Sequence, residues 1–437
     1  MESRRQPNVS STDVEPYGQE GLPLKEALQR IQIALLNKRL KRSTDTKAKV
    51  SLLDALGRVS AESVHTHEAI PGFRASIMDG YALGQASCPK VGDCWQLVGR
   101  SYPGAPFEGE LVAGEAIRIL TGAVIPKGSE WIVPQELCKL CPPTNTGQDI
   151  LTLIKQASTN PWIRAENDEF SAGDVVIHQH VRLMPADLAR AASCGLTELE
   201  VEPKPMIGLL ISGDELTPPG IPRASGAIWE SNSTLLKTLL ARLGYPIAEC
   251  LVIGDNREAL RSSLLELANT CDVVVSTGGV SAGDTDWVRP LVAELGEVDF
   301  WKLFLKPGRP FAFGWIGDNV PFFGLPGNPV ATAITALQLL WPALQQMEGL
   351  IEPIILPRLQ VALIDEMQRT PGRPELARAR LEIDRDGALQ ARCNGSQASS
   401  RIGSLSGCDL LLEIPAEMAD LKPGTKLWAQ LLRLPVL

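Results

Sequence analysis

A glycine-rich loop followed by acidic residues is the first feature of this sequence that could carry chemistry. Residues 272–287 read DVVVSTGGVSAGDTDW, an apolar run that leads into two adjacent glycines. Gly278 and Gly279 let the backbone approach a ligand closely, and Ser281 offers a hydroxyl group. The backbone amides ahead of a following helix are oriented for an anion. The loop therefore fits either an anion-binding turn or a plain strand-to-helix turn.

Two common nucleotide-binding patterns do not match this loop. No lysine follows the glycines, which excludes the phosphate loop G-x-x-x-x-G-K-[ST], and GGVSAG does not fit G-x-G-x-x-G. Asp284 and Asp286 stand at the expected helix start, where the helix dipole favours acids and where Mg²⁺ beside a phosphate would need them. Asp255 follows the previous predicted strand and would face the same edge of a parallel sheet. Asp255, together with Asp284 or Asp286, is thus a candidate for holding a metal ion.

Two further loops carry groups suited to an oxyanion. The segment KLFLKPGRP at 302–310 holds the cations Lys302, Lys306 and Arg309, which fit a pyrophosphate or another oxyanion but also a solvated basic loop. In FFGLPGNPVAT at 322–332, prolines and a glycine fix an unusual turn before a long apolar helix. The residues expected to shape a ligand site in that turn are Pro326, Asn328 and Pro329.

Composition limits the classes of protein to which these loops can belong. The chain has 437 residues, 44% of them hydrophobic and 21% charged, which is typical of a globular protein with more than one domain. A net charge of −9 argues against a broad nucleic-acid surface. The first residues have no apolar run of the kind found in secretory signals. The longest apolar segment is too short for a membrane span, and the nine cysteines are scattered along the chain. We therefore expect free thiols and a cytoplasmic location.

The pattern along the chain indicates several domains. Apolar residues at helical spacing predict helices at 23–40 and 51–64, and short runs separated by Gly and Pro then predict strands. From residue 206, strands alternate with helices, which predicts a parallel sheet covered on both faces. The last unit has about five short β runs, which fit a small barrel or a sandwich. We expect a disordered tail at 1–21, an elongated first domain at 22–85 and 158–205, an inserted β domain at 86–157, an α/β domain at 206–350 and a β domain at 351–437.

Seven motifs, taken in order, resemble the molybdopterin molybdenumtransferase family, the molybdenum-insertion enzymes related to the E domain of gephyrin. They are PGFRASIMDGYAL, LTGAVIPKGSEWIVPQE, SGDEL, SNSTLL, STGGVSAGDTDW, KLFLKPGRPFAFG and GLPGNPVAT. The resemblance implies an L-shaped homodimer with its active site at the subunit interface, and a chain of four parts: an elongated first domain, an inserted β domain, a parallel α/β molybdopterin-binding domain and a C-terminal β-barrel. It implies insertion of molybdate into adenylylated molybdopterin with release of AMP, using Mg²⁺ or a similar divalent cation.

The resemblance also implies roles for individual residues. Asp255 and Asp286 match metal positions at the pyrophosphate, and Glu215 lies at the carboxyl end of the first α/β strand. The pterin- and phosphate-binding loop would contain Gly278, Gly279, Ser281 and Asp284. Lys302 and Lys306 match positions that hold phosphate or the incoming oxyanion, and the molybdate donors would be Lys306, Arg309, Arg373 and Ser399. Asp79 and Thr121 match positions that approach the α/β domain of the partner subunit.

Several residues depart from the family pattern, in ways that bear on subunit contacts and molybdate affinity. They are Arg74, Ala75 and Ile77 in the loop before Asp79, Glu166 and Glu169 where a cation and an aspartate are usual, and Ala331 in place of a frequent serine. The metal and pterin positions are not affected.

Two other functions share part of the pattern. The α/β module also resembles the adenylyltransferase that prepares adenylylated molybdopterin, a possible partner, but MDGYA, KPGRP and PGR favour the insertase. A non-catalytic gephyrin-like scaffold would be expected to lose the metal pair, which this sequence retains. The lone C-x-x-C at Cys138 and Cys141 has no second pair and is too little for a zinc site.

Overall fold

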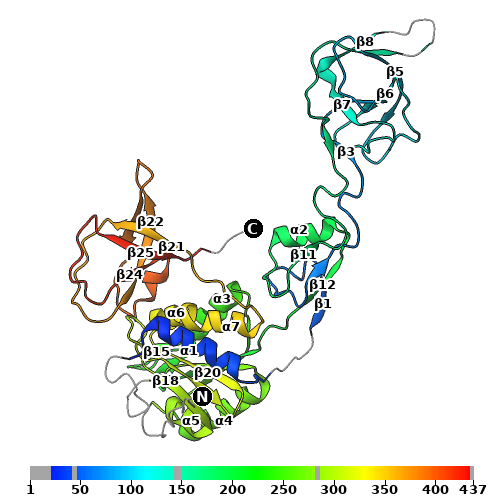
Figure 1. Ribbon diagram of the computed structural model, residues 1–437. Helices are drawn as coiled ribbons and strands as arrows, with labels where there is room; N and C mark the ends of the chain where they lie inside the picture. The colour runs from blue at the N-terminus through cyan, green and yellow to red at the C-terminus, as the bar shows by residue number, and fades with distance from the viewer. Residues whose placement is uncertain (1–20, 42–46, 142–146, 148, 281–285, 434–437) are drawn as a thin grey trace, which may run out of the picture.

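The computed structural model describes residues 21–41, 47–141, 147, 149–280 and 286–433. Nearly all of the expected tail, together with Ser281 and Asp284, lies outside these ranges. The chain forms an α/β domain with a barrel on one side and an arm on the other, and the inserted β domain lies at the far end of the arm (Figure 1). The multidomain α/β and β architecture expected from the sequence is confirmed.

The α/β domain is built on one six-stranded sheet with the order β16-β13-β17-β20-β19-β18. The strands are β13 (Ile207–Ser212), β16 (Ile247–Ile253), β17 (Val273–Thr277), β18 (Gly296–Trp301), β19 (Ala312–Ile316) and β20 (Val320–Leu325). Strands β16, β13, β17 and β20 run parallel, as expected, whereas β19 and β18 pair antiparallel. The antiparallel pair matters for the site because it carries the basic loop 302–310 to the carboxyl edge of the parallel strands.

Helices cover both faces of this sheet, because alternate residues of its buried strands point to opposite sides. One core contains Val273 and Val275 of β17 together with α1 (Leu24–Asn37), α3 (Asn232–Arg242), α6 (Pro329–Thr335) and α7 (Trp341–Met347). The other contains Val274 with α4 (Arg257–Thr270) and α5 (Val288–Leu295). A π-helical segment at Ala336–Leu340 joins α6 to α7, so the long apolar run does form a buried helical rod.

Two features near the N-terminus differ from the sequence reading. Helix α1 was expected in the first domain, but its stripe Ala27, Ile31 and Leu35 is buried in the α/β core. The helix expected at 51–64 is absent: the chain turns after β1 (Ala48–Ser51), and Gly57 adopts a positive φ of 69°. Leu53 of that expected helix is 88% exposed, so the apolar spacing does not mark a buried face.

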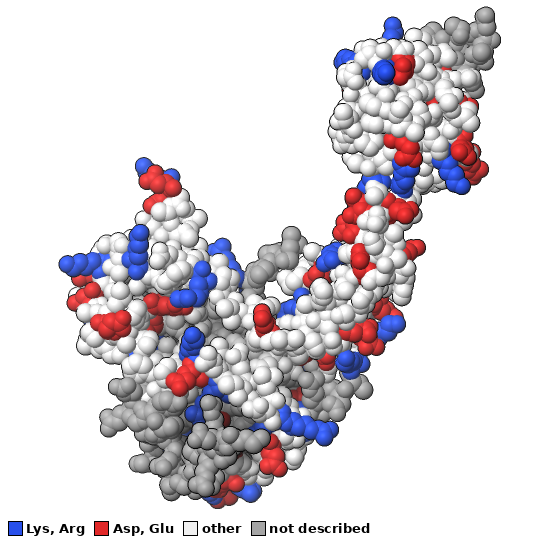
Figure 2. All heavy atoms as spheres, in the orientation of Figure 1, with Lys and Arg blue, Asp and Glu red and all other residues white. Residues whose placement is uncertain are grey.

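The first domain is assembled from two separate chain segments, as expected. Strand β1 pairs with β12 (Glu198–Val201), β2 (Val64–His65) with β11 (Val175–Ile177), and β3 (Ala75–Ser76) with β10 (Ile163–Arg164). Helix α2 (Pro185–Ser193) packs beside them. These antiparallel pairs form the arm, along which acidic side chains gather (Figure 2).

The inserted domain is a six-stranded sheet with the order β7-β4-β6-β5-β9-β8. Its strands are β4 (Gly80–Leu83), β5 (Cys94–Ser101), β6 (Glu115–Ile119), β7 (Trp131–Pro134), β8 (Cys138–Cys141) and β9 (Ile150–Leu153), with a 3-10 turn at Gln135–Leu137. Strand β4 pairs with both β6 and β7, so this sheet begins before the boundary expected at residue 86.

The C-terminal unit closes into a barrel with the order β21-β23-β22-β24-β25. Its strands are β21 (Arg358–Leu363), β22 (Glu375–Ile383), β23 (Leu389–Cys393), β24 (Leu410–Ile414) and β25 (Lys426–Leu431), and a 3-10 turn lies at Ile402–Leu405. Of the barrel and sandwich that the β runs left open, the barrel is therefore the one that forms.

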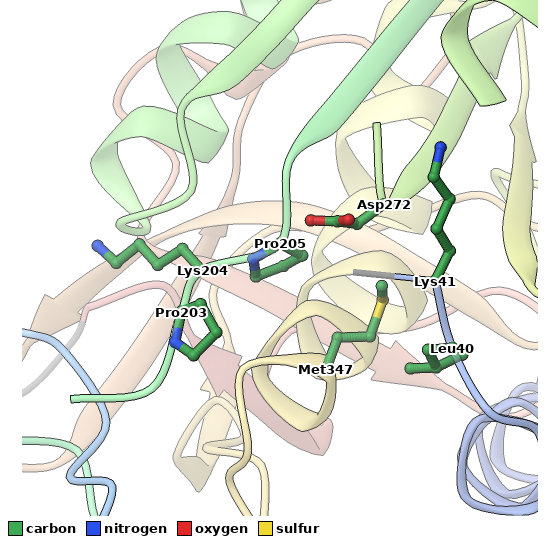
Figure 3. Close-up of a pocket in the computed structure, with 7 residues that line it drawn as sticks. All are labelled: Leu40, Lys41, Pro203, Lys204, Pro205, Asp272 and Met347. Carbon is green, nitrogen blue, oxygen red and sulfur yellow. The ribbon is translucent and has the colours of Figure 1, made fainter. Parts of the chain in front are cut away.

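The arm joins the α/β domain beside a small cavity of about 10 Å³ (Figure 3). It is lined by Leu40, Lys41, Pro203, Lys204, Pro205, Asp272 and Met347, and the Lys41 and Lys204 ammonium groups point away from it. This volume holds about one water molecule, which excludes a pterin substrate. No helix among the described residues is long and apolar enough to cross a membrane.

Candidate functional site

Several loops meet at one edge of the α/β sheet, because the carboxyl ends of its parallel strands share that edge. Asp214 and Glu215 follow β13, Asp255 follows β16, Gly278 and Gly279 follow β17, and Pro326, Asn328 and Pro329 follow β20. The end of β18 and the start of β19 add the loop from Lys302 to Phe311, since Trp301 pairs with Ala312 and Ala312 pairs with Gly324. The edge thus has acids at one end and cations at the other.

The acidic end is organised by two aspartates on neighbouring strands. The Asp255 N–H donates to Asp214 Oδ1 at 2.8 Å, and the Asp214 N–H donates to Asp255 Oδ2 at 3.4 Å. Burial raises the pKa of the Asp255 carboxyl, and the nearby charges of Asp214, Glu215 and Asp286 raise it further. Asp255 and Asp286, expected as a pair from the sequence, therefore lie close enough to influence each other. Asp214 was missed, although it stands inside the quoted motif SGDEL.

The sequence suggested that Asp286 stands at the start of a helix, but it lies before the helix. Helix α5 begins at Val288, and Asp286 lies two residues before it. The N-cap residue of that helix is Trp287, which makes no side-chain cap hydrogen bond. This placement leaves the helix-dipole explanation for Asp286 weaker than its proximity to Asp255.

The middle of the edge is a glycine turn against the end of β13. Gly278 and Gly279 have φ angles of 86° and 64°. A Cβ on Gly278 would lie 2.6 Å from the Ser212 carbonyl oxygen, and one on Gly279 would lie 2.6 Å from Val288 Cγ2. Both positions therefore require glycine, and the exposed backbone can approach a ligand closely.

Asn232 ties this turn to the loop after β20. Its Nδ2 donates to the Gly327 carbonyl oxygen at 2.7 Å and to Thr277 Oγ1 at 3.4 Å. Thr332 Oγ1 in turn donates to the Pro326 carbonyl oxygen at 2.6 Å. These bonds hold the two loops in register. Asn232 was not predicted as a site residue, although it stands in the quoted motif SNSTLL.

The basic end begins at Trp301, the last residue of β18. Lys302 Nζ lies 4.0 Å from the centre of the Trp301 ring, and the Arg289 guanidinium lies 4.2 Å from it. Trp301 Nε1 donates to the Val280 carbonyl oxygen at 2.9 Å. The indole therefore joins the lysine to the chain directly after the glycine turn.

The barrel supplies further groups to the basic end. Arg373 Nη1 donates to the Leu305 carbonyl oxygen at 2.9 Å, and Lys306 Nζ lies 3.1 Å from Glu375 Oε2. Burial lowers the pKa of Arg373, and the charge of Arg309 lowers it further, so the two guanidinium groups are neighbours. Lys306, Arg309 and Arg373, predicted from distant motifs, thus gather at one place. Glu375 was not anticipated.

Ser399 also reaches the α/β edge from the barrel. Asn328 Nδ2 donates to Ser399 Oγ at 3.1 Å, and the Val330 N–H donates to the Ser399 carbonyl oxygen at 3.1 Å. Helix α6 starts at Pro329, so these bonds fix its first turn against the barrel. Ser399 of the barrel therefore lies directly beside the loop after β20.

Asp79 and Thr121 form a pair of their own in the inserted β domain. Asp79 Oδ1 accepts from the Thr121 N–H at 2.8 Å and from Thr121 Oγ1 at 2.9 Å. The backbone bond, followed by the hydroxyl bond, lowers the pKa of Asp79. Thr121 also lines a cavity of about 400 Å³ together with Phe73 and Ile77. This domain lies at the far end of the arm from the α/β edge of the same chain (Figure 1).

The acidic end was tested for its fit to a divalent cation. Among the described residues, no three His, Cys, Asp or Glu side chains converge into a ready-made metal cage. Mg²⁺ usually takes only one or two carboxylates and completes its shell with phosphate oxygens and water. Burial is the main cause of the raised pKa of Asp255, and the charges of Asp214, Glu215 and Asp286 raise it further, so these acids lie near one another. These carboxylates therefore fit a cation that arrives with a phosphate-bearing ligand.

Comparison with family models covers most of the chain. Residues 22–195 match the MoeA N-terminal region (domain I and II), residues 208–346 match a probable molybdopterin binding domain, and residues 360–432 match the MoeA C-terminal region (domain IV). The α/β edge described above lies in the second match, and Arg373, Glu375 and Ser399 lie in the third.

Individual relatives agree with these matches. The chain is 31% identical to molybdopterin molybdenumtransferase of Haemophilus influenzae, over 83% of this chain and 89% of that protein. It is 29% identical to gephyrin of Dictyostelium discoideum, over 88% of this chain and 59% of that longer protein. A solved molybdopterin biosynthesis moeA protein from Pyrococcus horikoshii superposes with a TM-score of 0.76 at 26% identity, covering 94% of this chain and 99% of the other.

Proposed function

The chain belongs to the molybdopterin molybdenumtransferase family, and we propose that it inserts molybdate into adenylylated molybdopterin, releasing AMP and yielding molybdenum cofactor. It is accordingly a transferase of molybdenum cofactor biosynthesis. One observation carries the proposal: the α/β edge places acids, a glycine turn and cations side by side in the order that a phosphate-bearing pterin and an oxyanion would need.

The glycine turn suits the pyrophosphate part of the substrate. Gly278 and Gly279 present backbone without side chains, and the amides of such turns bind anions. Ser281 and Asp284 lie outside the described residues, and their roles in this loop rest on the family resemblance.

Molybdate is a tetrahedral dianion, so its pocket should be built from donors and positive charge. Lys306 and Arg309 of the α/β domain, with Arg373 and Ser399 of the barrel, are the groups proposed for it. Lys302, beside the glycine turn, would hold phosphate oxygens. Asn328 would keep Ser399 in place through the bond at 3.1 Å.

A divalent cation such as Mg²⁺ would be held by Asp255 and Asp286, where it neutralises phosphate charge and orients the phosphoanhydride. Glu215 lies beside this pair and adds to its negative charge. The protein side chains bind and orient the substrate.

We propose that the protein acts as a homodimer with its site at the subunit interface. Asp79 and Thr121 lie in the domain at the end of the arm, and a second chain could bring them to the α/β edge. Contact with the adenylyltransferase that supplies the substrate also belongs to this proposal. All nine cysteines are free, which supports the cytoplasm as the compartment.

The test is to mix purified protein with adenylylated molybdopterin, Mg²⁺ and molybdate, and to measure AMP and active cofactor. Wild type should form both, and Asp286→Ala should keep its fold but lose turnover. Binding of the pterin nucleotide without either product would contradict the insertase function and favour a scaffold. Formation of adenylylated molybdopterin from ATP and molybdopterin would instead favour the adenylyltransferase.

A further inference from the structure

A buried carboxylate lies among the cations where the barrel meets the α/β edge. Glu375 is the first residue of β22, and its side chain is 0% exposed. Its Oε2 accepts from Lys306 Nζ at 3.1 Å and from Arg369 Nε at 3.3 Å. The Lys306 side chain is 47% exposed, whereas Arg369 is 3% exposed. The carboxylate therefore faces one cation of the site and one cation of the barrel interior.

The backbone around this ion pair is fixed as well. The Lys306 N–H donates to the Pro374 carbonyl oxygen at 2.8 Å, and the Leu376 N–H donates to the Lys306 carbonyl oxygen at 2.8 Å. Residues on both sides of Glu375 are thus hydrogen-bonded to the lysine. The backbone of Lys306 is therefore fixed beside Glu375, and its terminal ammonium group contacts the buried carboxylate.

Glu375 also balances the other cations nearby. The positive charge of Arg309 lowers the pKa of Arg373, whereas the negative charge of Glu375 raises it. The charge of Glu375 also raises the pKa of Arg378, which is fully buried. A cluster of like charges assembled before its anion arrives needs such a counter-charge, since unpaired buried charges are costly.

We propose that Glu375 is a positioning residue for the oxyanion end of the site, whose carboxylate holds the Lys306 ammonium group where it meets the incoming anion. The inference rests on the proposed function, in which that anion is molybdate. A free lysine side chain has considerable rotamer entropy, which it loses when it binds an anion. If Glu375 already holds the ammonium group, less entropy is lost when the anion binds. Glu375 does not itself touch the reacting groups.

This role predicts opposite effects on turnover and on binding. Glu375→Gln releases Lys306 but also removes a negative charge that repels molybdate. We expect kcat for AMP release to fall about tenfold, because a misplaced group chiefly affects the reacting geometry, while the molybdate KM stays the same or falls. Unchanged kcat in the folded variant, or a raised KM at unchanged kcat, would overturn the proposal.

A matched control lies on the same strand. Glu382 of β22 pairs with Arg392 at 2.6 Å and its side chain is 40% exposed, so Glu382→Gln removes a barrel ion pair that does not include Lys306. We expect Glu382→Gln to leave kcat and KM unchanged. If Glu375→Gln does not fold, Glu375→Asp serves instead: it keeps the buried negative charge but withdraws the carboxylate from Lys306 and Arg369 by one methylene. A wild-type kcat in a folded Glu375→Asp would equally overturn the proposal.

A readout independent of turnover separates this inference from the proposed function. Brief treatment with acetic anhydride, followed by peptide mass spectrometry, measures how readily Lys306 is acylated. We expect several-fold faster acylation of Lys306 in Glu375→Gln or Glu375→Asp than in wild type and Glu382→Gln. Equal acylation would show that Glu375 does not hold the ammonium, even if wild type proved inactive with molybdate and the proposed function failed.

Discussion

Asp255 and Asp214 bind each other's backbone across two adjacent parallel strands. The Asp255 N–H donates to Asp214 Oδ1 at 2.8 Å, and the Asp214 N–H donates to Asp255 Oδ2 at 3.4 Å. This exchange places two carboxylates side by side at the end of the sheet, where the charge of Asp214 contributes to the raised pKa of Asp255. The folded protein thus keeps these carboxylates close together before a ligand binds, and a bound cation would offset their repulsion.

The first prediction concerns that charge. Because burial and neighbouring acids raise the pKa of Asp255, its ionised form destabilises the folded state. The penalty is absent below the unfolded pKa of 3.8 and complete above the raised folded pKa. Asp255→Asn should therefore raise the metal-free Tm at pH 7 by about 1 °C, and the difference should vanish toward pH 4.

Mg²⁺ provides the complementary half of that experiment. It should raise the Tm of wild type and have a smaller effect on Asp255→Asn, because the cation binds the folded carboxylates. Calorimetry at several Mg²⁺ concentrations measures both. A Mg²⁺ response of equal size in the two proteins would remove Asp255 from the metal site.

The second prediction concerns the subunit interface. If the arm of one chain completes the site of the other, Asp79→Ala and Asp255→Ala should each be inactive alone. Mixed by unfolding and refolding together, they should recover about a quarter of wild-type activity, since half the dimers are mixed and each has one intact site. AMP release from the mixture measures this. No recovery in a mixture shown to contain mixed dimers would place Asp79 and Asp255 outside a shared site.

The third prediction concerns the Asp79 carboxyl itself. Its pKa is lowered first by the Thr121 backbone bond and then by the Thr121 hydroxyl bond, so these bonds favour the charged form above pH 3.8 and are lost as pH falls through the folded pKa. Thr121→Val removes only the hydroxyl bond. We expect the pKa of Asp79 to move part of the way back toward its ordinary value, as followed by carboxyl ¹³C NMR. An unmoved pKa would mean that the backbone bond alone sets it.

The sequence was a good guide wherever one physical rule dominated. The apolar run Val273–Val275 predicted a buried strand, and the rule that ligands lie beyond the carboxyl ends of parallel strands placed Asp255 correctly at the edge. The helix expected at 51–64 failed because spacing alone cannot tell an exposed leucine such as Leu53 from a buried one. The pairing of Glu375 with Lys306 was not predicted for another reason. The two residues are 69 positions apart in the sequence, and only the folded barrel brings them together.

The fourth prediction tests the glycine turn against a matched glycine elsewhere. Gly317 has a φ of 60°, and nothing lies within 4 Å of an added Cβ. Gly317→Ala should therefore lower the free energy of unfolding only by the left-handed backbone penalty of about 1–2 kcal/mol. Gly278→Ala adds a contact of 2.6 Å with the Ser212 carbonyl oxygen. It should cost about 1–3 kcal/mol more in urea unfolding and abolish AMP release. Equal stability of the two variants would contradict the close approach.

The last prediction concerns the joint between the arm and the α/β domain. Tyr245 is 1% exposed, and its hydroxyl donates to Glu348 Oε2 at 2.5 Å and accepts from Arg182 Nη2 at 2.7 Å. Arg182 comes from the arm and also reaches Glu348 Oε2 at 2.9 Å. Burial, and then the Glu348 charge, raises the pKa of Tyr245 far above its ordinary value, so its hydroxyl stays protonated as a donor.

Tyr245→Phe deletes this hydroxyl without leaving a large cavity. It should lower the free energy of unfolding in urea by about 1–3 kcal/mol, because Glu348 and Arg182 lose a buried partner. Tyr102→Phe is the control, since that ring lies beside Arg100 in the inserted domain and outside the joint. If the triad also fixes the arm, X-ray scattering should show a broader range of molecular dimensions for Tyr245→Phe. Wild-type stability in Tyr245→Phe would mean that the arm is held chiefly by its other contacts with the α/β domain, such as the bond of Arg182 Nη2 to Glu348 Oε2 at 2.9 Å.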